Sequence, residues 1–133
     1  MIKLIVGTKG SGKTKRLIDM INDNVAKVNG SIVCIEKSMQ STYHISSGCR
    51  LIDMDEYHIE DYTTFYGFFA GILAGNYDIE QVYIDGLMRI GTHTQEDLAE
   101  LLNKMDALAK DQTIIVTVSA AEEDLIDDIR KYL

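Results

Sequence analysis

The stretch KLIVGTKGSGKTKRL, residues 3–17, decides the fold of this chain. Its apolar start, residues 3–6, predicts a short buried strand, and residues 7–14 fit the pattern G-x-x-x-x-G-K-[S/T] at every fixed position. Amphipathic spacing then begins near Lys13 and predicts a helix. Glycines let the backbone N–H groups of such a loop turn toward an anion, and the helix start adds its positive end. The stretch therefore predicts a phosphate-binding site between a strand and a helix.

The loop carries a complete set of candidate ligands for a nucleoside triphosphate and Mg²⁺. We expect Lys13 to reach the terminal phosphates and to act as a catalytic residue in phosphoryl transfer, while the Thr14 hydroxyl binds Mg²⁺. Lys9 is interpreted as solvated or as a local phosphate contact. The predicted nucleotide-binding residues are Gly7, Thr8, Lys9, Gly10, Ser11, Gly12, Lys13 and Thr14.

Apolar runs and amphipathic runs alternate along the rest of the 133 residues. Buried strands are expected at residues 31–36, 50–54, 81–85 and 113–119. Helices are expected from Lys13 to an Asn29-Gly30 stop, around residues 62–73, from a Thr94 cap with Asp97 three places on, and from a Ser119 cap to Leu133. This alternation predicts one domain over residues 1–133, an α/β three-layer α/β/α sandwich with a mostly parallel sheet.

Composition and charge narrow the class of protein. Apolar residues make up 46% of the chain and charged residues 26%, as in globular proteins. The net charge of −8 argues against a broad nucleic-acid surface, and the longest apolar run, residues 65–75, is shorter than the roughly 20 residues of a membrane span. Cys34 and Cys49 lack metal-site spacing and are interpreted as reduced thiols, and no apolar leader precedes the first strand. We therefore expect a cytoplasmic protein.

Acidic residues at strand ends form the second candidate part of the site. Asp85 closes the predicted strand 81–85, where a carboxylate would hold Mg²⁺ together with Thr14. Asp85-Gly86 is also a turn dipeptide, so a purely structural role stays open. A further acidic group at residues 53–56 would either line the site or cap the helix that follows, and we expect the cap.

The segment NKMD, residues 103–106, fits the guanine-reading pattern N-K-x-D. In GTPases that pattern follows a strand, whereas apolar residues at helical spacing surround it here. These are Leu98, Leu101, Leu102, Met105 and Leu108. We therefore expect no guanine-reading role and favour ATP over GTP as the bound nucleotide.

The order of elements resembles that of the additional-strand (ASCE) P-loop NTPases, particularly the RecA-like and thymidine-kinase-like members. The resemblance implies that the strand at residues 113–119 lies between the strands ending at Gly7 and Asp85. It also implies that a polar residue near the end of that strand, Thr117 or Ser119, lies close to the γ-phosphate of bound ATP.

The same resemblance implies that Glu36, at the end of the strand after the loop helix, is the catalytic glutamate of an ATPase. Many additional-strand ATPases carry this glutamate directly after the Mg²⁺-binding aspartate, but Gly86 occupies that position here. The alternative for Glu36 is a solvated strand end paired with Lys37.

A second resemblance covers nearly the whole chain, which is similar to short bacterial ATP-binding proteins labelled twitching-motility PilT-type ATPases. The segments that carry it are KLIVGTKGSGKTKRLID, VCIEK, RLIDMDEY, GNYDIEQVYIDGL and TVS. The acidic and histidine-rich boxes of secretion ATPases are missing from the sequence, so pilus retraction is not implied.

Three functions stay open at this point. The first is a slow Mg²⁺-dependent ATPase or an ATP-driven switch, the second is a nucleotide-binding module for regulation or assembly without hydrolysis, and the third is a small thymidine-kinase-like phosphotransferase. A protein partner or a homo-oligomer would fit the first two. No pattern assigns the arginine that often speeds phosphoryl transfer, which would come from a neighbouring subunit or from Arg16, Arg50, Arg89 or Arg130.

Overall fold

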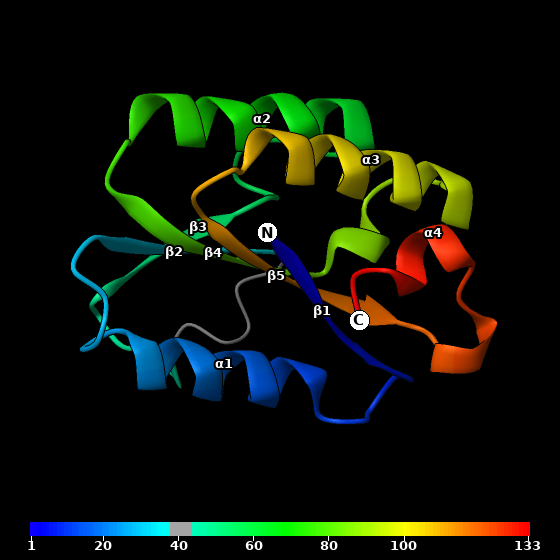
Figure 1. The fold of residues 1–133 in the computed structure, drawn as a ribbon, viewed down its shortest axis with the longest axis horizontal. Helices are drawn as coiled ribbons and strands as arrows, with labels where there is room; N and C mark the ends of the chain where they lie inside the picture. The colour runs from blue at the N-terminus through cyan, green and yellow to red at the C-terminus, as the bar shows by residue number, and fades with distance from the viewer. Residues whose placement is uncertain (38–43) are drawn as a thin grey trace.

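A parallel sheet of five strands forms the middle layer of this computed structural model, which describes residues 1–37 and 44–133 (Figure 1). The strand order across the sheet is β1-β5-β4-β2-β3, and every neighbouring pair runs parallel. The strands are β1 (Ile2–Gly7), β2 (Ser31–Glu36), β3 (Cys49–Asp53), β4 (Ile79–Asp85) and β5 (Thr113–Ser119). The predicted strands are therefore confirmed.

Helices cover both faces of the sheet, which gives the predicted three-layer α/β/α arrangement (Figure 1). Helix α1 (Lys13–Asn24) lies on one face, and α2 (Tyr62–Gly75) and α3 (Gln95–Leu108) lie on the other. A short helix, α4 (Asp127–Arg130), packs against α3. Within the described residues, no helix combines the length and the apolar character that crossing a bilayer requires.

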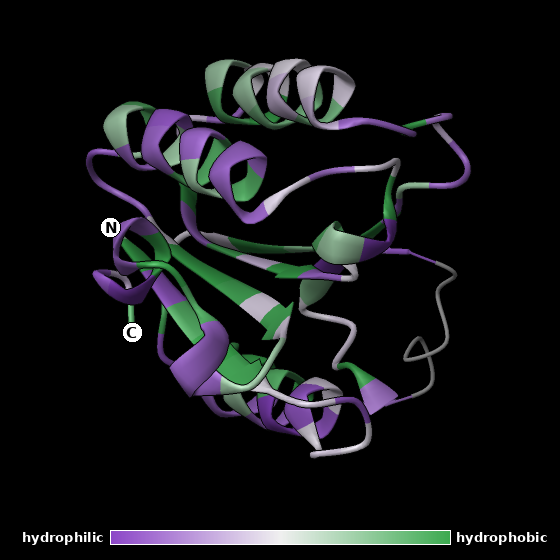
Figure 2. Cartoon of the chain, turned by 90° about the vertical axis from the view of Figure 1, so that its right-hand side faces the viewer, coloured by the Kyte–Doolittle hydropathy of each residue, from purple (hydrophilic) through white to green (hydrophobic). Residues whose placement is uncertain are grey.

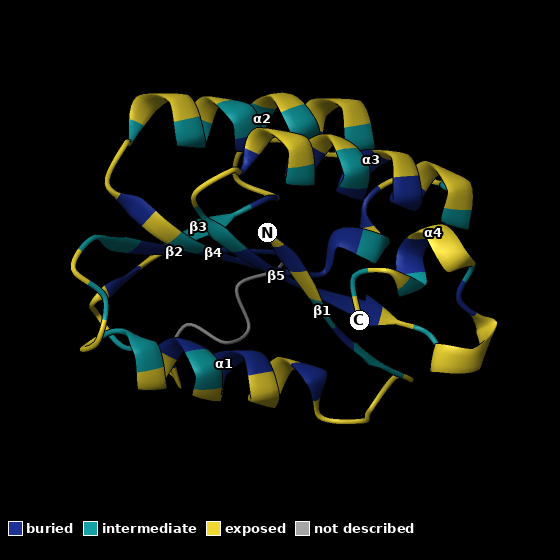
Figure 3. Ribbon diagram, in the orientation of Figure 1, coloured by how far each residue is buried: buried dark blue, intermediate teal, exposed yellow. Residues whose placement is uncertain are grey.

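Each face of the sheet carries its own apolar cluster, and the strands are mostly buried between the two (Figure 3). Phe65 and Phe69 of α2 are fully buried on one face, and Leu17 and Ile21 of α1 are fully buried on the other. Burial of each such side chain stabilises the fold by about 1.5–3 kcal/mol. The strands inside are mostly hydrophobic and hydrophilic residues lie along α1 and α3, whereas α2, which has no charged residue, is pale to green (Figure 2).

Strand β5 lies between β1 and β4, which confirms the position that the resemblance implied. Its last residue, Ser119, pairs with Gly7 at the end of β1, and Glu36 at the end of β2 pairs with both Asp85 and Asp53. Because all the strands point the same way, this one edge collects the loop after β1 and the carboxyl ends of its neighbours. Open parallel sheets bind their ligands at that edge.

Side-chain caps begin the two helices on the far face. Asp97 N donates to the Thr94 hydroxyl at 3.1 Å, and Thr94 N donates to the Asp97 carboxylate at 2.9 Å, which is the predicted capping box of α3. Asp61 caps α2 by accepting a 2.7 Å hydrogen bond from Thr64 N, and this bond lowers the pKa of the Asp61 carboxyl. The expectation that residues 53–56 cap α2 is therefore wrong.

Helix α1 ends earlier than predicted, at Asn24 instead of near Gly30. The Asn24 side chain donates to Met20 O at 2.8 Å and to the Tyr83 hydroxyl at 3.3 Å. An asparagine that bonds the helix's own carbonyls competes with the regular backbone bonds and favours a helix end.

Ser119 does not cap the final helix, contrary to the prediction. The sheet ladder continues past it, because Ala120 N donates to Gly7 O at 3.1 Å. The chain then forms a 3-10 turn, η3 (Glu122–Asp124), and α4 begins only at Asp127. Gln95 holds the segment between them, since its amide donates to Asp124 O at 2.9 Å and accepts from Ile126 N at 2.8 Å.

Candidate functional site

The loop between β1 and α1 is a tight turn built around glycines in the left-handed region. Gly10 and Gly12 have φ angles of +81° and +87°, in the left-handed region that favours glycine. Ser11 N closes the turn by donating to Thr8 O at 3.1 Å. Gly12 is the N-cap of α1, and in the described part of the chain no side chain caps this helix. The N–H groups of the first helical turn therefore point toward the sheet edge without a side-chain acceptor.

Lys13 supplies a buried cation, only 8% exposed, at the same place. Its ammonium donates to Thr8 O at 3.0 Å, so the side chain folds back over the loop. Gly7 lets Ser11 pack against the end of β1, because a Cβ at position 7 would overlap Ser11 Oγ. An ammonium has three donors, so Lys13 can bind an anion while it keeps the bond to Thr8.

Asp85 joins the loop to the neighbouring strand through two hydrogen bonds. Thr14 Oγ1 donates to Asp85 Oδ2 at 3.0 Å, and Thr117 Oγ1 donates to Asp85 Oδ1 at 2.6 Å. Asp85 and Thr117 are 7% and 4% exposed. The structure thus brings together the predicted metal ligands, Thr14 and Asp85, and it selects Thr117 over Ser119 as the strand β5 residue that contacts them. A carboxylate beside hydroxyl groups is the hard oxygen environment that Mg²⁺ prefers.

Glu36 is a buried carboxylate at the end of β2, only 2% exposed. It pairs with Asp85 in the β2–β4 register, so both acids end neighbouring strands at the same edge. The alternative of a solvated glutamate is wrong, because the side chain is buried, and Lys37 makes an ion pair with Asp55 at 2.5 Å. Glu36 lines the same cavity as the loop residues Lys9, Gly10 and Lys13.

A cavity of about 410 Å³ unites these groups. Its walls come from the loop, from the carboxyl ends of β2, β4 and β5, and from the residues after β4. The predicted residues in its lining are Lys9, Gly10, Lys13, Thr14, Glu36, Asp85, Thr117 and Ser119. The acids at residues 53–56 do not belong to this lining within the described residues, so neither of their two expected roles is met.

The cavity is richer in positive charge than the chain as a whole, which carries a net charge of −8. Four cations line it, namely Lys9, Lys13, Lys37 and Arg89, against two carboxylates. Lys37 was not predicted as a site residue, and Arg89 was one of four arginines that the sequence left without an assigned role. Each follows a strand end closely, and that position in the sequence is the signal that would have found them. A local excess of cations favours an anionic ligand.

The two cysteines lie under α1, in the apolar cluster beside the strands that carry the acids. Burial raises the pKa of the Cys34 thiol well above its ordinary value, and the charges of Cys49, Glu36 and Asp85 add to this rise. Burial, followed by the charge of Glu36, raises the pKa of Cys49 to about 11. Both thiols are free and protonated at neutral pH, which makes them packing residues.

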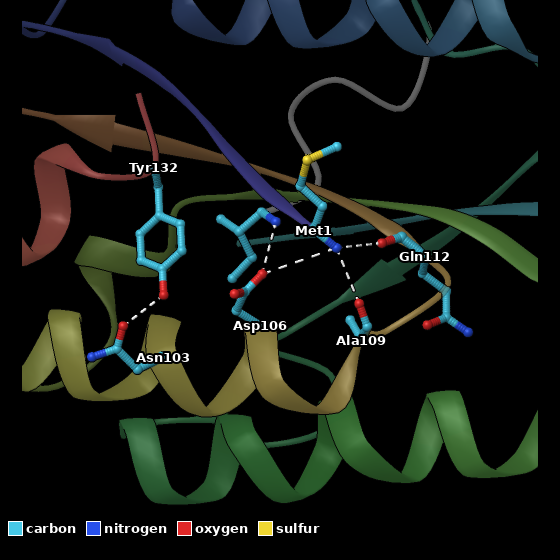
Figure 4. A network of polar contacts seen from close by, with 7 residues as sticks. Met1, Asn103, Asp106, Ala109, Gln112 and Tyr132 are labelled. Carbon is cyan, nitrogen blue, oxygen red and sulfur yellow. Dashed lines mark hydrogen bonds and ion pairs between the residues drawn. The ribbon is translucent and has the colours of Figure 1, made fainter.

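The N-K-x-D segment has structural partners away from the cavity (Figure 4). Asn103 Oδ1 accepts a 2.6 Å hydrogen bond from the Tyr132 hydroxyl. Asp106 Oδ1 accepts from Ile2 N at 3.2 Å and lies 4.0 Å from the amino group of Met1. These contacts attach α3 to the start of β1 and to the residues after α4. The expectation that this segment is helical is confirmed, since it lies inside α3.

Comparison with known proteins supplies no assignment for this cavity. The chain matches no model of a known protein family, and a search of curated proteins finds no relative. What the cavity binds is therefore inferred from its own residues.

Proposed function

We propose that this chain is a Mg²⁺-dependent ATP-binding protein that hydrolyses ATP slowly, built on the additional-strand P-loop NTPase fold. One observation carries the proposal: Thr14, Asp85 and Thr117 form a hydrogen-bonded chain directly beside Lys13 and the glycine loop. Thr14 lies at the start of α1, Asp85 ends β4 and Thr117 lies on β5, and the insertion of β5 between β1 and β4 supports the fold.

The phosphates of ATP fit the loop side of the cavity. Gly10 and Gly12 shape the backbone, the start of α1 supplies N–H donors, and Lys13 supplies an ammonium. Charge-assisted hydrogen bonds from such donors are roughly twice as strong as neutral ones, so they favour a polyanion. A volume of about 410 Å³ lies in the range of small-molecule sites.

Mg²⁺ fits the oxygen donors of Thr14 and Asp85, which are already within hydrogen-bond distance of each other. When bound, the ion would neutralise negative charge on the β- and γ-phosphates. Thr117 orients Asp85 from the opposite side, and hydrogen bonds of this kind hold a ligating carboxylate in one direction.

Hydrolysis needs a group that takes a proton from water, and Glu36 is the candidate. A water oxygen bonds to the γ-phosphorus while the bond from that phosphorus to the β–γ bridging oxygen breaks, so ADP and inorganic phosphate leave. Glu36 would accept the proton that the attacking water loses. Its position supports this role, because Glu36 is buried at the end of β2 and lines the cavity beside Asp85.

A second candidate is a module that binds ATP without turnover, for regulation or assembly. Gly86 favours it, because the residue directly after Asp85 offers no carboxylate to activate water. The two candidates share the binding site and differ only in whether Glu36 acts as a base.

The test measures binding of ATP and GTP by calorimetry, with Mg²⁺ and with EDTA, together with phosphate release. Lys13→Ala should weaken ATP binding by about 10- to 100-fold, since it removes a charge-assisted bond to phosphate. Lys15→Ala is the matched control, because Lys15 is exposed on α1 and pairs with Asp19. Glu36→Gln should still bind ATP but lose turnover.

Three results separate the candidates. Turnover that disappears in Glu36→Gln supports the ATPase. Tight binding by the wild type with no phosphate release supports the binding module. ATP affinity that is equal in the wild type and Lys13→Ala would contradict both.

A further inference from the structure

Arg89 is the feature of the cavity that the proposed function does not yet use. It ends a 3-10 turn, η2 (Leu87–Arg89), that follows β4 directly. Gly86 has a φ of +88°, which turns the chain sharply at the end of the strand, and Arg89 N donates to Gly86 O at 3.0 Å. This tight turn brings Arg89, four positions beyond Asp85, back to the cavity, where it forms part of the wall.

Gly86 also leaves the space that the guanidinium occupies. A Cβ at position 86 would lie 2.6 Å from Arg89 Nη2 and 3.1 Å from Arg89 Nε. Atoms do not approach this closely without a shift, so a larger residue would push the guanidinium away. Gly86, which has no side chain, therefore allows the Arg89 guanidinium to lie where it does.

Arg89 has no acceptor of its own in the protein, as far as the described residues extend. Lys13 donates to Thr8 O, and Lys37 pairs with Asp55. The Arg89 side chain makes no such hydrogen bond or ion pair within the described ranges, and it is exposed. A guanidinium held at a cavity wall without a protein acceptor is available to a ligand.

Among the residues described, the other three arginines do not line the cavity. Arg130 donates to Glu122 O at 2.6 Å, and Arg50 lines a different hollow beside the edge strand β3. Arg16 is exposed on α1 and is not part of the cavity wall. Arg89 is thus the arginine that the fold directs to the cavity.

We propose that Arg89 binds the γ-phosphate and serves as the arginine finger of this site, supplied by the same chain. The inference rests on the proposed function. A guanidinium binds phosphate oxygens with two parallel hydrogen bonds, which an ammonium cannot do. Lys13 begins α1 after the β1 loop and Arg89 follows β4, with β5 between those strands, and both residues line the cavity. Two cations from opposite sides stabilise charge on the γ-phosphoryl oxygens during transfer.

The experiment compares the affinities of ADP and of AMP-PNP, a triphosphate analogue that resists hydrolysis, each with Mg²⁺. The proteins are the wild type, Arg89→Ala, Arg89→Lys and the control Arg16→Ala, which removes the same charge outside the cavity wall. Arg89→Ala should weaken the binding of AMP-PNP by about tenfold or more and the binding of ADP by less than about twofold. Arg89→Lys should fall between, because it keeps the charge but loses the paired bonds. Arg16→Ala should retain the wild-type ratio of the two affinities.

The outcomes separate this inference from the proposed function. If wild type binds neither nucleotide, the proposed function fails and the inference fails with it. If wild type binds both but Arg89→Ala keeps the wild-type ratio of affinities, only the role of Arg89 is overturned. This includes the case in which Arg89→Ala loses affinity for both ligands by the same factor, because a contact to the γ-phosphate must weaken AMP-PNP binding more than ADP binding. If wild type hydrolyses ATP, phosphate release in Arg89→Ala should also fall by at least about 100-fold.

Discussion

Thr117 donates a 2.6 Å hydrogen bond to Asp85 across two neighbouring strands, and both side chains are buried. Thr117→Val keeps the shape of the side chain but removes the donor, so Asp85 loses a partner inside the protein. We expect the free energy of unfolding to fall by about 1–3 kcal/mol in a denaturant titration. Thr113→Val is the control on the same strand, and equal stability of the two variants would contradict a special role for this bond.

Asp85 should also decide how strongly ATP binding depends on Mg²⁺. Asp85→Asn keeps the size of the side chain but removes a negative charge from the proposed metal site. We expect the gain in ATP affinity caused by Mg²⁺ to shrink by about 10- to 100-fold, while affinity in EDTA stays equal or rises. Calorimetry with and without Mg²⁺ measures this, and Asp111→Asn, at an exposed position before β5, is the control. An unchanged Mg²⁺ effect in Asp85→Asn would remove Asp85 from the metal site.

The start of α3 gives a prediction on stability that is independent of ligand. Thr94→Ala removes the hydroxyl that accepts from Asp97 N, so the capping box is broken. Loss of such a cap costs about 1 kcal/mol, which should lower the melting temperature by roughly a few degrees. Thr92→Ala, at an exposed position two residues earlier, should leave the melting temperature almost unchanged. If Thr94→Ala and Thr92→Ala have the same melting temperature, the capping box does not stabilise the fold.

The buried thiol of Cys49 predicts a loss of stability at high pH. Its pKa is raised from 9.0 to about 11 in the folded chain, first by burial and then by the charge of Glu36. The folded state therefore holds the proton more tightly than the unfolded state, so this stabilisation is complete below about pH 9 and is lost as the pH rises through 11. A shift of this size corresponds to about 2–3 kcal/mol.

Denaturant titrations between pH 7 and 11 measure this effect, with Cys49→Ala as the comparison. The variant cannot ionise at position 49, so its stability should decline less than that of the wild type over the same range. Parallel curves for the two proteins would show that Cys49 does not titrate differently in the folded and unfolded states.

Local patterns predicted most of the architecture. The glycine spacing of residues 7–14 and the apolar runs of the strands specify local backbone, and the structure has a loop and strands there. The Thr94 box was also predictable, because its two partners are three residues apart. Each of these features depends on neighbours in the sequence, which is why the sequence alone indicates them.

Features that depend on distant partners were missed or misplaced. Ser119 looks like a helix cap, but Gly7 in another strand keeps the following residue in the sheet ladder. The sequence did not distinguish Thr117 from Ser119 as the polar residue of β5 in the site, whereas in the structure Thr117 donates a hydrogen bond to Asp85. Arg89 had no motif to mark it, since its place depends on the tight turn at Gly86.

The central position of β5 has a consequence for how the chain acquires its structure. β1 and β4 cannot pair with each other in the native order, because β5 occupies the place between them and forms the ladder with both. During synthesis the first strand must therefore wait until residue 119 has left the ribosome before its native ladder can form. Pairings between distant parallel strands form slowly, because a long loop must close first. Until then the backbone N–H and C=O groups of β1 and β4 that β5 will pair with have no ladder partner, and unpaired strand edges of this kind favour aggregation of unfinished chains.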